Sequence, residues 1–231
     1  MMHITKTILT AMVMTFLVSG CVPPAVYNTK SEAFPEMYTE KPRSLLIMPP
    51  MNMSTAADAK AYYATTVEMP LAFQGYYTFP YELTSEILKQ QGIYDSELVY
   101  DIPLTKFYEY FGADAVLFTK IQKWDTVYAV LAASLTVSID AEIKSTRTSQ
   151  TLWKYNGTVV VDLSGGNNSG GGIAGLIASA IITAVNTAAA DYTTYAKQAN
   201  GRFVGTVPFG PYHPLYMQDQ NMKIQMQQAT Q

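Results

Sequence analysis

The clearest pattern along this chain is an alternation of apolar and polar residues at positions 131–143. Every odd position in that segment is apolar, and the even positions from Ser134 onward are polar. A period of two residues is typical of an antiparallel strand with one buried face and one face in water. A second alternating segment covers residues 153–163, and we predict a β-bulge at its Asn156-Gly157 pair, with a second tight turn as the alternative.

Shorter apolar runs predict three more strands. Residues 45–48 are Leu-Leu-Ile-Met and are followed by two prolines, which is typical of a strand buried on both faces. Residues 115–118 form a similar apolar run. Residues 97–100 are interpreted as another short strand between two helical segments.

Two helices are predicted from apolar residues that recur every three or four positions. Residues 81–91 place Leu83, Ile87 and Leu88 on one stripe. Residues 104–111 have apolar side chains at i, i+3, i+4 and i+7. Each segment has a proline at its start and a glycine after its end, which are ordinary helix boundaries.

Helical structure is also expected around residues 56–65 and over the Ala-rich residues 173–197. Residues 173–190 carry no charge, which is compatible with burial against the sheet, with packing against another subunit or with membrane contact. Residues 170–175 match the pattern G-x-G-x-x-G. Because no strand follows the helix to carry the acidic residue of a dinucleotide site, we interpret these glycines as a loop and predict no cofactor.

These elements predict an α+β fold, with one compact domain built from a mixed or antiparallel sheet and packed helices. The composition of each segment predicts the boundaries of the domain and of the segments on either side of it. Residues 1–20 are expected to be a lipoprotein signal peptide, residues 21–43 a lipidated N-terminus and tether, and residues 44–207 the α+β domain. Residues 208–231 are expected to be an extended or disordered tail, because they show little apolar periodicity.

Cys21 is the only cysteine of the chain, and its position predicts a lipid anchor. It follows a short start carrying Lys6, an apolar run over residues 7–18, and the small pair Ser19-Gly20. This is the layout of a secretory signal peptide. The small pair followed by Cys resembles the bacterial lipobox, in which the thiol is acylated and the chain is cut before it. The alternative is an ordinary signal peptide followed by an unmodified cysteine.

The composition excludes several classes of function. The net charge of −3 argues against nucleic-acid binding, which usually needs a basic face. With Cys21 acylated, no thiol remains for a disulfide, a nucleophile or a metal. Without residues 1–20, His213 is the only histidine, so neither a His-rich zinc site nor a typical catalytic triad is expected. Asp140 and Glu142 share the polar face of a strand and are interpreted as solvated side chains.

Residues 62–81 are the most aromatic part of the chain. Tyrosine supplies a large contact area with one polar group, so this segment predicts a surface that binds a protein partner. We expect its contacts to come from four tyrosines: Tyr62, Tyr76, Tyr77 and Tyr81. The alternative is that these rings pack in the core and its loops.

Several motifs resemble one group of bacterial envelope proteins. Gly-Ala-Asp followed by an apolar strand at residues 112–118 is similar to the periplasmic domain shared by CsgG-type lipoproteins and the TolB N-terminal domain. The hairpin at residues 139–153 resembles the same group. More narrowly, the lipobox at Cys21 and the segments at residues 75–80, 112–117 and 210–214 together resemble a proteobacterial family of lipoproteins of unknown function.

This resemblance implies a domain like the TolB N-terminal domain, attachment to the outer membrane and no known catalytic residues. It also implies a CsgG-like lipoprotein as partner. Independently of the resemblance, a second copy of this chain is the alternative partner. Val22 favours the outer membrane, because Asp commonly follows the cysteine of lipoproteins retained in the inner membrane. The resemblance leaves open whether the domain faces the periplasm or the cell surface.

The sequence therefore predicts a non-enzymatic, lipid-anchored outer-membrane protein that joins an envelope or secretion assembly through protein contacts. Alternatives are a lipoprotein activator of a periplasmic peptidoglycan enzyme, a surface antigen without enzymatic role, and an enzyme that uses carboxylates. The tether at residues 21–43 spans roughly 70 Å when fully extended, which is short for an activator that reaches through the cell wall.

Overall fold

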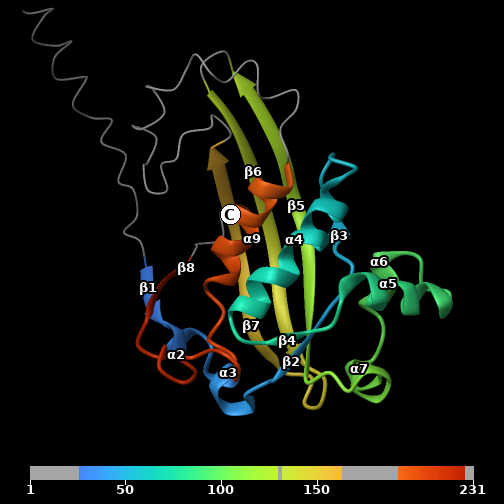
Figure 1. Ribbon diagram of the computed structural model, residues 1–231, viewed down its shortest axis with the longest axis vertical. Coiled ribbons are helices and arrows are strands. Elements are labelled where there is room, and N and C mark those ends of the chain that lie inside the picture. The colour runs from blue at the N-terminus through green and yellow to red at the C-terminus, as the bar shows by residue number, and fades with distance from the viewer. Residues whose placement is uncertain (1–25, 130–131, 163–191, 227–231) are drawn as a thin grey trace, which may run out of the picture.

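A mixed sheet with helices on both faces organises the chain (Figure 1). The structure, a computed structural model, describes residues 26–129, 132–162 and 192–226. The strands are β1 Val26–Thr29, β2 Ser44–Ile47, β3 Met51–Asn52, β4 Tyr77–Thr78, β5 Ala115–Ala129, β6 Ala132–Ser145, β7 Thr151–Asp162 and β8 Lys223–Met226. The helices are α2 Lys30–Ala33, α3 Pro35–Glu40, α4 Ala59–Phe73, α5 Tyr81–Gln90, α6 Ser96–Val99, α7 Leu104–Phe111 and α9 Tyr192–Val204.

The larger sheet has six strands. Five follow the order β4-β2-β5-β6-β7, and β3 pairs with β5 beyond the end of β2. β2 is parallel to both of its neighbours, whereas β5, β6 and β7 form an antiparallel meander. β1 and β8 form a separate two-stranded antiparallel sheet. The predicted α+β domain with a mixed sheet and packed helices is confirmed.

Alternate residues of β2 and the residue after it point to opposite faces of the sheet, which creates two cores. Leu45 and Ile47 belong to the larger core with α4 and α9. Leu46 and Met48 belong to a smaller core with α5, α6 and α7. All four side chains are fully buried. The strand predicted here, buried on both faces, is therefore confirmed.

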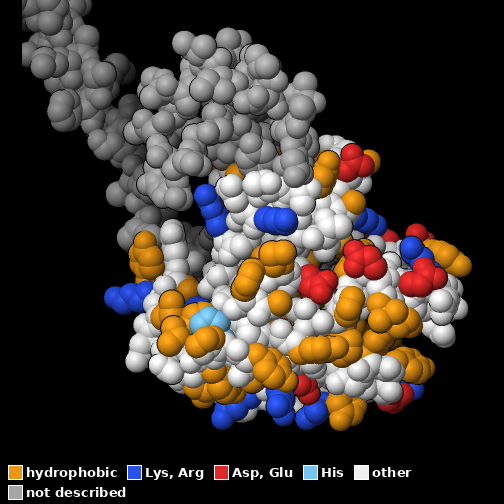
Figure 2. All heavy atoms as spheres, in the orientation of Figure 1, with side chains coloured by type: hydrophobic (Ala, Val, Ile, Leu, Met, Phe, Trp, Pro, Cys, Tyr) orange, Lys and Arg blue, Asp and Glu red, His pale blue; other side chains and the backbone are white. Residues whose placement is uncertain are grey.

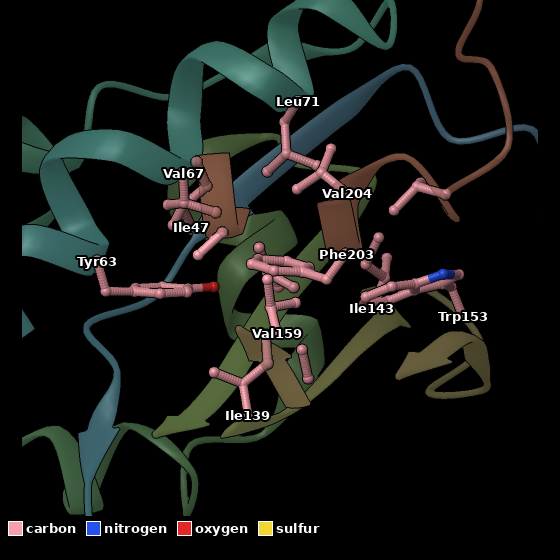
Figure 3. Close-up of a cluster of buried hydrophobic side chains, with 14 of the residues drawn as sticks. Ile47, Tyr63, Val67, Leu71, Ile139, Ile143, Trp153, Val159, Phe203 and Val204 are labelled. Carbon is pink, nitrogen blue, oxygen red and sulfur yellow. The ribbon is translucent and has the colours of Figure 1, made fainter. Parts of the chain in front are cut away.

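The larger core lies between the sheet and the pair α4 and α9. Figure 3 shows Tyr63 of α4, Phe203 of α9 and Trp153 of β7 pointing into the same space. The rings of Tyr63 and Phe203 stack with their centroids 6.2 Å apart. The Tyr63 hydroxyl is also hydrogen-bonded to the Thr119 hydroxyl of β5. These contacts fix both helices on one face of the sheet.

The helices on this face differ from their predicted bounds. A helix was expected around residues 56–65, but α4 continues to Phe73 because Val67 and Leu71 extend its buried side. The helix expected over residues 173–197 lies mostly outside the described residues, as does the glycine motif before it. Its C-terminal part is helical and belongs to α9.

The alternating segment forms β6 as predicted. Its odd residues from Leu135 to Ile143 are buried in the larger core, and the even ones lie on the opposite, polar face. The bulge predicted in the neighbouring strand is misplaced. Asn156 pairs in register with Asp140, and the register shifts instead at Leu152. The Asn156 side chain donates a hydrogen bond to the Asp140 carboxylate, so it is used across an extended strand pair rather than in a turn.

The strand predicted at residues 97–100 is wrong. Ser96–Val99 forms the one-turn helix α6, in which Val99 is buried and Leu98 is exposed. A run of four residues is too short for its period to separate a strand from a turn of helix. The smaller core decides the outcome here, because it buries Val99 and packs against the adjacent Tyr100, whereas strand alternation would point these two side chains to opposite faces.

The segment predicted to be a tether is folded from Val26 onward. It forms β1, α2 and α3, and Phe34 between the two helices is buried in the larger core. Pro35 occupies the first turn of α3, where a proline is tolerated because no backbone N–H is needed. A proline within the predicted tether is therefore a helix start. The described fold begins five residues after Cys21.

The segment predicted to be an extended tail also belongs to the fold as far as the structure describes it. β8 pairs with β1. Before β8, the Gly210 N–H donates to the Gln74 carbonyl at 2.7 Å, and the Tyr212 N–H donates to the Gly75 carbonyl at 3.0 Å. Two of the motifs that carry the family resemblance are thus in direct contact.

A buried ion pair joins the N-terminal and C-terminal segments. Lys30 Nζ lies 3.2 Å from Asp219 Oδ2, and the two side chains are 1 % and 0 % exposed. The carboxylate also accepts hydrogen bonds from the Tyr38 hydroxyl and the Phe209 N–H. Burial lowers the pKa of Lys30, and the charge of Asp219 acts in the opposite direction. Charge and β pairing therefore hold the two segments together.

Candidate interaction site

The described parts of the chain offer no group of three or more His, Cys, Asp or Glu that could hold a metal ion. His213 packs within the C-terminal segment. Its ring stacks on Phe209 with centroids 3.7 Å apart, and its Nδ1 accepts the Leu215 N–H. The imidazole thus has a structural role in the turns that precede β8.

The two carboxylates considered for acid–base chemistry lie on the polar face of β6. Asp140 accepts hydrogen bonds from the side chains of Gln122 and Asn156. Glu142 lies 3.1 Å from the Lys144 amine on the same strand. Both belong to a partly exposed polar network, in agreement with their interpretation as solvated side chains.

The four tyrosines predicted to form a partner surface lie in different environments. Tyr76 is buried, its hydroxyl donates to the Pro208 carbonyl at 2.8 Å, and burial raises its pKa well above the usual value. Tyr62 is partly buried on α4 and stacks on Trp124 with ring centroids 6.3 Å apart. Both rings therefore support the fold.

Tyr81 and Tyr77 lie near each other in the sequence but differ in exposure. Tyr81, the first residue of α5, packs against the larger core, and burial raises the pKa of its hydroxyl. Tyr77 lies on the short edge strand β4 and is 55 % exposed. The structure does not bring the four tyrosines to one surface, and Tyr77 is the one that is largely open to solvent.

An apolar cleft lies between α5 and α7, on the sheet face opposite α4 and α9. Its volume is about 480 Å³. We call it the α5–α7 cleft, and its lining consists of seven apolar or aromatic residues and two polar ones: Ile87, Leu88, Ile93, Ile102, Phe107, Tyr110, Phe111, Gln91 and Lys106. Leu88 and Phe107 are buried in the smaller core, whereas Tyr110 is 72 % exposed. The cleft therefore runs from the core to the solvent.

The two helices that wall the cleft are those predicted at residues 81–91 and 104–111. Each follows a proline, Pro80 or Pro103, with φ near −55°. A proline fixes this backbone angle and prepares the first helical turn. The Thr84 hydroxyl donates back to the Pro80 carbonyl at 3.1 Å, which secures the start of α5.

The cleft arises because these helices carry more apolar side chains than the smaller core can cover. In the predicted stripe of α5, Leu88 is buried, whereas Ile87 is partly exposed and Leu83 is exposed. Ile93 and Ile102 flank α6 and are only partly buried against the same core. Sequence reasoning did not single out these two isoleucines or their role. An apolar stripe broader than the buried side of a helix is the signal that points to such a cleft.

A row of aromatic rings connects the cleft to the edge of the sheet. Tyr77 meets Phe79 edge to face with centroids 5.2 Å apart, and Phe79 meets Phe111 in the same way at 6.2 Å. Phe111 lines the cleft. Tyr77 is therefore the predicted tyrosine that adjoins the cleft, through a continuous aromatic contact.

Cys21, the predicted lipidation site, lies outside the described residues. Among the helices that the structure does describe, none combines the length and the apolar character needed to cross a bilayer.

Three solved structures illustrate what this chain is similar to. The crystal structure of lipoprotein GNA1162 from Neisseria meningitidis is 29 % identical and matches with a TM-score of 0.49, over 62 % of this chain and 98 % of that chain. A PelC dodecamer from Paraburkholderia phytofirmans is 11 % identical, with a TM-score of 0.42 over 73 % and 90 %. The NMR structure of E. coli LpoB is 15 % identical, with a TM-score of 0.40 over 62 % and 74 %.

Sequence comparison identifies the family. The family model described as "Putative lipoprotein GNA1162-like" matches residues 33–208. The Neisseria meningitidis protein named "Putative lipoprotein NMB1124/NMB1162" is 30 % identical over 151 residues, which cover 65 % of this chain and 69 % of that protein. The wider resemblance to CsgG-type and TolB domains stays a prediction. The chain belongs to the GNA1162-like family of lipoproteins.

Proposed function

We propose that this protein is a non-enzymatic lipoprotein of the outer membrane that joins an envelope assembly through the α5–α7 cleft. The cleft is the observation that carries this proposal, because it leaves apolar side chains around Ile87, Ile102 and Tyr110 in contact with water. Covering such a surface with a partner is favourable by about 25 cal/mol per Å² of apolar area. Exposed apolar surfaces framed by polar residues commonly mark protein-binding sites.

The acyl chains predicted on Cys21 would hold the domain close to the membrane. Val26 of β1 follows Cys21 by five residues, so the two are separated by at most about 18 Å. This reach does not favour an activator that acts across the cell wall. It favours a partner at the membrane surface, and a CsgG-like lipoprotein is the candidate that the resemblance suggests.

Cys21→Ser is expected to release the protein from the membrane, because the acyl chains are the anchor that this proposal assigns. Stable membrane binding requires more than one lipid chain or an additional signal, so its loss lowers the membrane-bound fraction on the order of tenfold or more. Fractionation of cells and partition into detergent measure this change, and the mass of the mature N-terminus identifies the lipid. A variant that stays in the membrane at the wild-type level would show that another anchor operates.

A photo-crosslinkable residue placed at Tyr110 is expected to capture a protein partner in intact cells, because this ring is exposed at the cleft. Phe73 of α4 provides the matched control: its ring is 74 % exposed, against 72 % for Tyr110, but it lies on the opposite face of the sheet. Both forms are expressed at the native level, irradiated and extracted with mild detergent. Mass spectrometry then identifies the adducts.

Adducts with another envelope protein from Tyr110 and not from Phe73 would support the assembly role. A peptidoglycan enzyme captured at Tyr110 would favour the activator, and an adduct with a second copy of the chain would favour a homo-oligomer. Equal adducts from both positions, or none from Tyr110, would refute the cleft as the contact site. In that case a surface antigen that needs no stable partner becomes the better description.

A further inference from the structure

The helices around the α5–α7 cleft carry the negative charge of this protein. Residues 81–111 hold six carboxylates and two lysines, a net charge of −4, whereas the whole chain carries −3. Figure 2 shows acidic and apolar side chains interspersed on the side of the molecule where Figure 1 places α5 and α6. The remainder of the chain is close to neutral.

Most of these carboxylates have no cation beside them. One of the six, Glu109, lies 2.7 Å from the Lys106 amine. The other five are exposed and form no ion pair with a Lys or Arg in the described parts of the chain: Glu82, Glu86, Asp95, Glu97 and Asp101. The segment that walls the apolar cleft thus carries negative charge that the fold itself does not neutralise, and the one charged side chain in the lining, Lys106, is already paired with Glu109.

We propose that the α5–α7 cleft binds a basic amphipathic helix of a partner protein. This inference rests on the proposed function and names the chemistry of the partner at the same site. Apolar side chains of the helix enter the cleft, and its flanking Lys or Arg side chains lie near Glu86 and Asp101. These two acids are the sequence neighbours of Ile87 and Ile102, which line the cleft. Complementary charge of this kind selects the partner and speeds its association.

The dimensions of the cleft agree with a short helix. Its volume of about 480 Å³ is roughly three times that of an engineered cavity of about 150 Å³ that admits benzene, so it accommodates several apolar side chains. α5 has 10 residues and is therefore about 15 Å long, equal to nearly three turns. In a helix that presents anchors at i, i+3 or i+4, and i+7, the first and last anchors are about 10.5 Å apart, which fits within that length.

Two other occupants are disfavoured by charge and position. An anionic lipid surface would be repelled by the acidic helices. Moreover, Figure 1 places β1, which follows the predicted anchor, on the side of the molecule opposite α5, α6 and α7. A second copy of the chain related by a twofold axis would bring two equally acidic surfaces together. A basic partner would be attracted by the acidic helices and so avoids the charge repulsion that disfavours the other two occupants.

The test uses the mature, lipidated protein in neutral detergent micelles and two labelled helical peptides of about 14 residues. Both peptides present Leu at i, i+3, i+4 and i+7. One carries Lys on the flanks of the Leu stripe, and the matched peptide carries Glu at the same positions. Fluorescence anisotropy measures their dissociation constants at low and high salt.

We expect the Lys peptide to bind at least on the order of tenfold more tightly than the Glu peptide, with a preference that falls as salt screens the charges. Tyr110→Asp should weaken binding of the Lys peptide on the order of tenfold, because Tyr is a typical anchor of interfaces. Phe73→Asp should leave the affinity for the Lys peptide unchanged. Glu86→Gln combined with Asp101→Asn should remove most of the preference between the peptides.

Other outcomes would overturn the inference in distinguishable ways. Equal binding of the two peptides would show an apolar site without charge selection, and weakening by Phe73→Asp alone would place the site elsewhere. Binding of the protein to anionic vesicles, or self-association, that Tyr110→Asp abolishes would assign the cleft to lipid or to a second copy. If neither peptide binds while Tyr110 still captures an envelope protein in cells, the proposed function stands and only the basic helix is refuted.

Discussion

Lys30→Met is expected to destabilise the protein by about 3–5 kcal/mol, because it leaves the Asp219 carboxylate buried without its cation. Lys30 and Asp219 are both almost completely inaccessible to solvent. The cost of a buried unpaired charge is much larger than the net gain from forming a buried pair. The free energy of unfolding in urea, compared with that of the wild type, measures the effect.

The C-terminal segment encloses the Lys30 amine. Its Nζ donates to the Val207 carbonyl at 2.9 Å as well as to Asp219, and it lies 4.7 Å from the centre of the Phe209 ring. The site is therefore closed by the C-terminal segment that the lysine binds. Removing the amine leaves one buried carbonyl and one buried carboxylate without that donor.

Two further variants separate the buried charge from simple loss of a side chain. Lys30→Met combined with Asp219→Asn removes both charges and should recover most of the lost stability. Lys123→Met breaks an exposed ion pair in which Lys123 Nζ lies 3.4 Å from Asp125 Oδ2. It should change the free energy of unfolding by less than about 1 kcal/mol. A loss below about 1 kcal/mol for Lys30→Met itself would show that the pair contributes little, which would contradict the prediction.

Local periodicity was sufficient where a regular pattern repeats over several residues of one element. The alternation in β6 and the stripe of α7 could be predicted because each repeats over several residues that meet a single core. The short segment at α6 has only four residues, of which Val99 is the one buried apolar side chain, and its period therefore could not distinguish a helix from a strand.

The two terminal segments could not be predicted because their stability is non-local. β1 and β8 come from opposite ends of the chain, and neither four-residue strand has a distinctive pattern of its own. A buried lysine such as Lys30 also contradicts the usual preference of this residue for solvent. Its contacts with Asp219, Val207 and Phe209, all in the C-terminal segment, explain its position.

The candidate site, too, depends on tertiary contacts that a local sequence pattern does not reveal. A run of tyrosines indicates contact area but not which rings face solvent, and Tyr76 is buried while Tyr77 is exposed. The cleft depends on how far α5 and α7 are from each other across the smaller core. That separation is a tertiary property, whereas the apolar excess of α5 at Leu83 and Ile87 is visible in the sequence.

Gly75→Ala is expected to destabilise the protein on the order of 4 kcal/mol, through two effects that add. Gly75 has φ +88°, a left-handed conformation that costs a residue with a Cβ about 1–2 kcal/mol. An added Cβ would also lie 2.3 Å from the His213 backbone nitrogen. The C-terminal segment must then move away and lose its hydrogen bonds to this loop, each of which contributes about 1 kcal/mol.

Gly92→Ala is the matched control for the backbone effect alone. Gly92 has φ +80°, but an added Cβ meets no atom within 4 Å, so its cost should be limited to about 1–2 kcal/mol. Unfolding in urea gives both free energies, and amide hydrogen exchange at Tyr212 reports whether the C-terminal segment has detached. Faster exchange is expected in Gly75→Ala and not in Gly92→Ala. If both variants lose the same stability and Tyr212 stays protected, the contact between the loop at Gly75 and His213 does not hold the C-terminal segment in place.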